Sequence, residues 1–113
     1  MAKGTRESRI KEEYTKLHKL YEGLPKNKLT LVEGLIENAA FMTVTLEDLQ
    51  EKIKEEGAVI VAKNGNGFDI TQEHPAQKSY NAMINRYTSV IKQLDALLPS
   101  EKIKGKLESL LDE

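Results

Sequence analysis

Apolar residues recur along the chain at alternating spacings of four and three residues, which is the period of one face of an α-helix. The first series predicts a helix over about residues 6–22 that Gly23 and Pro25 bring to an end. Its apolar members are Ile10, Tyr14, Leu17, Tyr21 and Leu24.

A second series predicts a long helix over about residues 27–56, with Asn27 as its N-cap and Gly57 as its stop. The β-branched run 43–45 and a capping-box pattern at residues 45–48 allow a restart, but the apolar register continues through them and favours one continuous or gently kinked helix. The seam of this helix, flanked by Val32 and Ile36, is Leu35, Ala39, Met42, Leu46, Leu49 and Ile53.

A third series predicts a helix that begins near Pro75 and ends before Pro99. Ser100 is then the expected cap of a short C-terminal helix that carries Ile103, Leu107 and Leu110. The seam of the third helix is Tyr80, Ile84, Tyr87, Ile91, Leu94 and Leu98.

The segment between the two long helices predicts a β-hairpin at residues 58–71. Asn64-Gly65 stands there between runs rich in β-branched residues, which is a strong short-range hairpin signal. A two-stranded ribbon is marginally stable alone, so we expect it to lean on the helices or on another subunit.

The predicted fold class is therefore mainly α, an antiparallel hairpin of long helices with N-terminal and short C-terminal helices and a small β-hairpin between the long helices. We expect a basic N-terminal segment at residues 1–25, a helical-hairpin oligomerisation core at residues 26–99 and a short C-terminal helix at residues 100–113. Both seams are too apolar to face water, so the first and the C-terminal helices or other copies of the chain must cover them. Self-association is the natural inference.

Composition narrows the function classes. The 113 residues suit one domain, and the absence of cysteine excludes disulfides and thiol chemistry and fits a reducing interior such as a cytosol. No apolar run of about 18 residues and no signal-peptide pattern are present, so we expect neither export nor a membrane span.

The sequence offers no catalytic, metal or cofactor site that we would predict. His18 and His74 lack further ligands at zinc-binding spacing, and His74 before Pro75 is more typical of a helix start. Acid pairs such as Glu47 with Glu51 are typical of a solvated helix face, and the Gly-Asn-Gly segment lacks the rest of a phosphate-binding loop. We expect a protein that is not an enzyme and needs no cofactor.

Charge is distributed unevenly along the chain. The net charge is −1, but residues 1–28 hold eight Lys and Arg against four acids, and residues 29–75 hold three against nine. A basic end favours a polyanionic partner, although interleaved acids dilute its field and a merely solvated face is the alternative. The candidate DNA-binding residues are Lys3, Arg6, Arg9, Lys11, Lys16 and Lys19.

Several strings resemble the P27 family of tailed-phage terminase small subunits. They are Leu29-Thr30-Leu31-Val32, Glu37-Asn38-Ala39-Ala40-Phe41-Met42, Leu46-Glu47-Asp48-Leu49-Gln50, the stretch from Ile53 to Gly57, His74-Pro75, Tyr80-Asn81, Ile91-Lys92-Gln93-Leu94 and Leu97-Leu98-Pro99. The resemblance covers about residues 27–99, and its most particular parts are the Glu-Asn-Ala-Ala run and the His-Pro entry to the third helix.

This resemblance implies a non-catalytic DNA-packaging factor. Members assemble into rings, recognise viral double-stranded DNA and hand it to a large terminase subunit, in the host cytoplasm during phage assembly or from a prophage. The alternative that the residues leave open is a helical adaptor or regulator that binds only protein.

Overall fold

The computed structural model describes residues 4–98, which form three helices and a two-stranded antiparallel sheet. The elements are α1 (Arg6–Lys19), α2 (Lys26–Glu56), β1 (Val59–Lys63), β2 (Asp69–Glu73) and α3 (Pro75–Ala96). The mainly helical fold class is confirmed. Lys3 and the predicted C-terminal helix at residues 100–113 lie outside the described residues.

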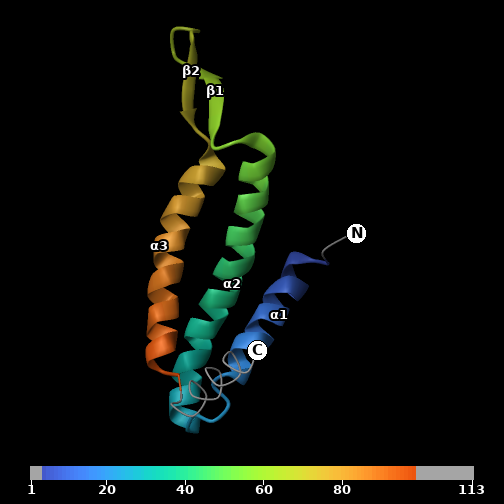
Figure 1. The fold of residues 1–113 in the computed structure, drawn as a ribbon, viewed down its shortest axis with the longest axis vertical. Coiled ribbons are helices and arrows are strands. Elements are labelled where there is room, and N and C mark those ends of the chain that lie inside the picture. Colours follow the sequence, from blue (N-terminus) through green and yellow to red (C-terminus); the bar gives the residue numbers. More distant parts are fainter. Residues whose placement is uncertain (1–3, 99–113) are drawn as a thin grey trace, which may run out of the picture.

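The two long helices run side by side in opposite directions, and α1 lies along the other side of α2 (Figure 1). The molecule is elongated, with a radius of gyration of 18.8 Å and extents of 61 × 31 × 28 Å. A compact domain of about 100 residues has a radius of gyration of about 13 Å. Much of each helix therefore stays on the surface.

The helix α2 is continuous through its β-branched run, as its unbroken apolar register predicted. The hydroxyl of Thr43 donates to the carbonyl of Ala39, so this polar side chain is satisfied within the helix. Its C-cap Gly57 has a φ of 84°, a conformation that glycine adopts without the penalty of a side chain.

The first helix begins at Arg6 as predicted, but its end and the start of α2 differ from the sequence prediction. The helix α1 ends at Lys19 rather than Glu22, and the chain continues in turns. The predicted cap Asn27 is wrong, since α2 begins at Lys26 behind Pro25 and has no side-chain cap. The cap therefore lies two residues earlier than predicted, at Pro25, whose ring fixes its φ.

The core lies where the C-terminal ends of α1 and α3 meet the first half of α2. Its centre is Tyr21, Val32, Ile36, Ala39 and Leu94. The hydroxyl of Tyr21 donates to the carbonyl of Leu94 at 2.6 Å, and burial is the main cause that raises the pKa of this phenol. Val32 and Ile36, the flanking residues of the predicted seam, are more deeply buried than most of the seam itself.

The strands β1 and β2 pair antiparallel, as the predicted hairpin requires, with Val61 opposite Thr71. The second strand reaches Glu73, beyond the predicted end of the hairpin. The side chain of Asn64 accepts from the backbone N–H groups of Asn66 and Phe68 and closes the turn. The hairpin projects beyond the end of the helices (Figure 1). Neither strand has a buried residue, so of the two supports expected for the hairpin, the helices of its own chain do not cover it.

The helix α2 is also long and apolar enough, by length and composition alone, to cross a membrane. An 18-residue window in it has a mean hydropathy of 1.3, although two acidic residues interrupt its apolar residues. A core helix passes the same test, and a third of this window is buried against the other helices.

Candidate functional site

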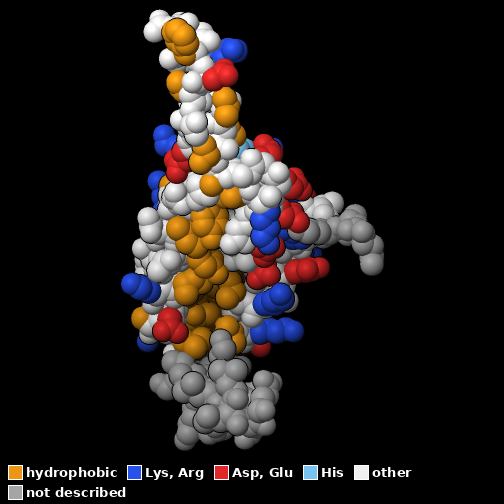
Figure 2. Space-filling view, turned by 45° about the horizontal axis from the view of Figure 1, so that its top comes forward, with side chains coloured by type: hydrophobic (Ala, Val, Ile, Leu, Met, Phe, Trp, Pro, Cys, Tyr) orange, Lys and Arg blue, Asp and Glu red, His pale blue; other side chains and the backbone are white. Residues whose placement is uncertain are grey.

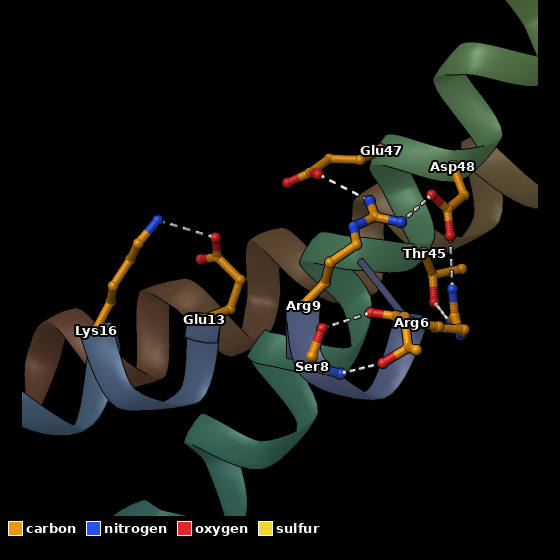
Figure 3. Close-up of polar contacts among 9 residues, drawn as sticks. Arg6, Ser8, Arg9, Glu13, Lys16, Thr45, Glu47 and Asp48 are labelled. Carbon is orange, nitrogen blue, oxygen red and sulfur yellow. Dashed lines mark hydrogen bonds and ion pairs between the residues drawn. The ribbon is translucent and has the colours of Figure 1, made fainter. Parts of the chain in front are cut away.

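The first two arginines of α1 face α2 and are held by its acidic residues (Figure 3). Arg6 Nη1 lies 2.9 Å from Asp48 Oδ2, and Arg9 Nη1 lies 2.7 Å from Asp48 Oδ1. Arg9 Nη2 reaches Glu47 Oε2 at 3.1 Å, and Arg6 also donates to the hydroxyl of Thr45. One carboxylate thus bridges two guanidinium groups between the helices.

The start of α1 places this arginine pair. Thr5 caps the helix by accepting from the backbone N–H of Ser8, and the Ser8 hydroxyl donates back to the Thr5 carbonyl. Residues three apart share a helix face, so Arg6 and Arg9 point together toward α2. The guanidinium of Arg6 also lies 5.1 Å from the ring centre of Phe41, within cation–π range.

The acidic residues of α2 favour the charged form of Arg9. The hydrogen bond to Asp48, followed by that to Glu47, raises the pKa of Arg9 above its ordinary value. The Arg9 side chain is only 15% exposed. Its charge is therefore directed at carboxylates of its own chain rather than at solvent.

The remaining predicted DNA-binding residues that the structure describes stay on the outside. Lys11, Lys16 and Lys19 are exposed, and Lys16 makes a solvent-exposed ion pair with Glu13 at 3.3 Å. Exposed pairs of this kind contribute little stability and exchange readily with other partners. The structure therefore divides the predicted basic set into two arginines engaged with α2 and three lysines that face solvent.

Sequence reasoning missed the acidic partners of the arginines. Glu47 is 50% exposed, as a solvated helix face predicts, but both Glu47 and Asp48 also pair with Arg9 of α1. Opposite charges on α1 and α2 were visible in the sequence, but the spacing gave no means of predicting which turns of the two helices meet.

Two histidines make separate contacts. His18 Nε2 lies 3.4 Å from Glu33, which also accepts from the Tyr14 hydroxyl. Burial, followed by the charge of Glu33, raises the pKa of Tyr14. Within residues 4–98 no group of three His, Cys, Asp or Glu side chains is arranged to hold a metal ion.

The second histidine, His74, lies at the root of the hairpin, where the chain passes from β2 into α3. His74 is buried, and its Nδ1 accepts from the backbone N–H of Ala76, so it caps α3 as predicted from its place before Pro75. Its Nε2 lies 3.0 Å from Glu56 Oε1. Since Nδ1 is an acceptor, Nε2 carries the proton and donates to the carboxylate.

An apolar band runs along the molecule between α2 and α3, with charged side chains on both sides of it (Figure 2). Of the twelve predicted seam residues, only Ala39, Leu46 and Leu94 are buried. The other nine are partly exposed, and they are Leu35, Met42, Leu49, Ile53, Tyr80, Ile84, Tyr87, Ile91 and Leu98. The two seams meet, but within residues 4–98 they are only partly covered.

These features define a class of protein, a helical scaffold with one ion-paired helix, an incompletely covered apolar band and a projecting β-hairpin. No protein-family model matches the chain, and no curated protein and no solved structure shows significant similarity to it. Its function is therefore argued from the surfaces described above and from the resemblance found in its sequence.

Proposed function

We propose that the chain is a phage terminase small subunit, a non-catalytic DNA-packaging factor that assembles into a homo-oligomer, recognises viral DNA and regulates a large terminase subunit. The observation that carries the proposal is the apolar band, in which nine of the twelve seam residues are partly exposed in the described part of the chain. The resemblance to the P27 family supplies the viral setting.

The magnitude of the exposed surface supports self-association. The chain exposes 8389 Å², whereas a compact monomer of 12.7 kDa exposes about 6,200 Å². The difference is of the order of one or two standard protein interfaces per subunit. In this proposal the long antiparallel helices form the oligomerisation core, and neighbouring copies cover the band.

The lysines of α1 supply the DNA contact in this proposal. Lys11, Lys16 and Lys19 face solvent, and Lys16 can exchange its weak ion pair with Glu13 for a phosphate. The arginines Arg6 and Arg9 fix α1 on α2 and so hold those lysines in place. This arrangement assigns positioning to the arginines and phosphate contact to the lysines.

Light scattering on the purified chain tests the oligomer. We expect a defined assembly of several subunits, and a folded monomer at high concentration would refute this half of the proposal. The variant Met42→Glu with Tyr87→Glu places two charges in the band and should dissociate the assembly, whereas Lys54→Glu with Thr88→Glu, at exposed positions of the same helices, serves as its control.

A salt titration of binding to duplex DNA tests the other half. We expect binding at roughly 50 mM salt that weakens steeply as salt rises. The variant Lys11→Glu, Lys16→Glu, Lys19→Glu should lose that binding while its assembly persists. Its control makes the same charge change at exposed residues of α3, through Lys78→Glu, Arg86→Glu and Lys92→Glu, and should retain more of the binding.

One observation favours a second candidate function, an adaptor that binds only protein. Two of the predicted DNA-binding residues, Arg6 and Arg9, are already held by carboxylates of another helix, α2. In that case the apolar band receives a partner helix, the wild-type chain binds no DNA at low salt, and the lysine variant behaves like the wild type.

A further inference from the structure

The β-hairpin holds most of the large apolar side chains that the described residues leave exposed. Of seven such residues, four belong to the hairpin, and they are Val59, Val61, Phe68 and Ile70. Val61 and Phe68 are 70% and 69% exposed. A two-stranded hairpin without a packed face is marginally stable in water, and a third strand removes this weakness.

The hydrogen-bond pattern identifies which backbone groups face outward. The N–H of His74 donates to the carbonyl of Ala58, and the N–H of Asn64 donates to the carbonyl of Phe68. Because an antiparallel ladder alternates, the even-numbered residues bond across the hairpin and the odd-numbered residues direct their N–H and C=O groups to the edges. Those residues are Val59, Val61 and Lys63 on β1, and Asp69, Thr71 and Glu73 on β2.

The two edges carry opposite charge. The β1 edge carries Lys63, and the β2 edge carries Asp69 and Glu73. Pairing two β2 edges would bring these acids together, whereas a β1 edge against a β2 edge repeats the Lys63–Asp69 ion pair that exists within the chain at 3.3 Å. Charge complementarity therefore favours the pairing of a β1 edge with a β2 edge.

We propose that β2 of one copy pairs antiparallel with β1 of the next copy, so that the hairpins of an assembly form one continuous sheet. This inference rests on the self-association proposed above and names a second contact for it. The contact is head-to-tail, so each copy uses both edges, and the arrangement extends until rotation closes it into a ring. In this register Val61 of one copy lies opposite Thr71 of its neighbour.

Site-directed disulfides test the pairing directly, because the chain has no cysteine of its own. Opposed residues that exchange hydrogen bonds in an antiparallel pair have Cα atoms about 5.5 Å apart, which suits a disulfide. The variants Val61→Cys and Thr71→Cys, co-expressed with tags of different size and oxidised, should give a mixed disulfide several-fold more abundant than either homodimer. Asn66→Cys at the exposed loop tip, co-expressed with Val61→Cys, measures random collision.

The proposal is overturned if the homodimers form as readily as the mixed product, or if Asn66→Cys cross-links equally well. Light scattering on the same samples distinguishes a failure of the hairpin pairing from a failure of the self-association. An intact assembly without the mixed disulfide refutes the hairpin pairing alone, whereas a monomer refutes the self-association as well.

A proline variant provides an independent test of the hairpin pairing. The N–H of Val61 points outward, so Val61→Pro removes an edge donor and spares the ladder within the hairpin. We expect Val61→Pro to weaken association several-fold with unchanged helical circular dichroism, while Val61→Thr, which keeps the N–H, associates like the wild type. Equal association of the two variants would contradict the pairing.

Discussion

The two ends of the molecule differ in the contacts that stabilise them. At one end three helices converge on Ile36, which has no exposed surface, and the Tyr21 hydroxyl fixes the end of α3. At the other end the hairpin has no buried residue and is held to the helices through His74 at its root. The chain therefore contains one region that is complete by itself and one that gains most from a neighbour.

This difference explains the division of roles in the proposed function. The packed end fixes the relative positions of α1, α2 and α3, so the surfaces that they present have a defined geometry. The apolar band and the projecting hairpin are the parts that leave surface uncovered. A protein that works by assembly needs both, a rigid frame and surfaces that only another molecule completes.

The largest effect is expected at the packed end. Ile36→Ala should lower the free energy of unfolding by about 2–5 kcal/mol, because it leaves a cavity among Val32, Ala39 and Leu94. Urea denaturation followed by circular dichroism measures this loss. Leu31→Ala is the control on the same helix, where the side chain is 77% exposed, and a comparable loss there would contradict the position of the core.

A smaller effect is expected for the buried hydroxyl. Tyr21→Phe leaves the Leu94 carbonyl without its 2.6 Å donor and should cost about 1–2 kcal/mol in the same unfolding experiment. Tyr80→Phe is the matched control, since the Tyr80 hydroxyl accepts from Gln50 in an exposed hydrogen bond. Tyr21→Phe should therefore lose more free energy of unfolding than Tyr80→Phe. Equal losses would show that the buried hydrogen bond of Tyr21 does not stabilise the packed end.

The sequence predicted the elements better than their packing. The three helical series and the Asn-Gly turn are local signals, and the helices, Gly57 and the continuous course of α2 agree with them. The fully buried Val32 and Ile36 were predicted only as flanking residues because the period of one helix does not specify which neighbour covers which face.

The candidate site shows the same limit. The basic residues of α1 were visible as a cluster, but nothing in their spacing indicated that Arg6 and Arg9 would meet Asp48. That contact joins residues about forty positions apart and depends on how α1 crosses α2. The role of His74 was predictable because capping is local, whereas its contact with Glu56 requires the fold.

The root of the hairpin provides a pH-dependent test. Hydrogen bonds from His74, and next from Lys52, lower the pKa of Glu56 below its ordinary value of 4.5. A carboxyl whose pKa is lowered by folding stabilises the native state above its ordinary pKa, and this contribution disappears as the pH falls through the folded value. The wild type should therefore be more stable than Glu56→Gln at neutral pH, with the difference disappearing under acid conditions well below 4.5.

Urea unfolding of both chains across this pH range measures the effect. Glu55→Gln, at a neighbouring exposed position, is the control and should follow the wild type throughout. A Glu56→Gln difference that stays constant with pH would show that the carboxylate does not stabilise the root of the hairpin through its charge.

The smallest effect is expected for α1, which has no buried residue and whose first turns are held by ion pairs that face solvent on one side. Salt screens such pairs, so raising its concentration from about 0.05 to 0.5 M should speed hydrogen exchange in the first turns of α1. The core amides around Ile36 should change far less, because apolar packing holds them.

Asp48→Asn removes the carboxylate shared by Arg6 and Arg9, so hydrogen exchange in α1 of this variant should already be fast at low salt and respond little to more salt. If the exchange of α1 were equally slow in that variant, apolar contacts from Tyr14 to Leu20 would be what holds the helix, and α1 would belong wholly to the packed end.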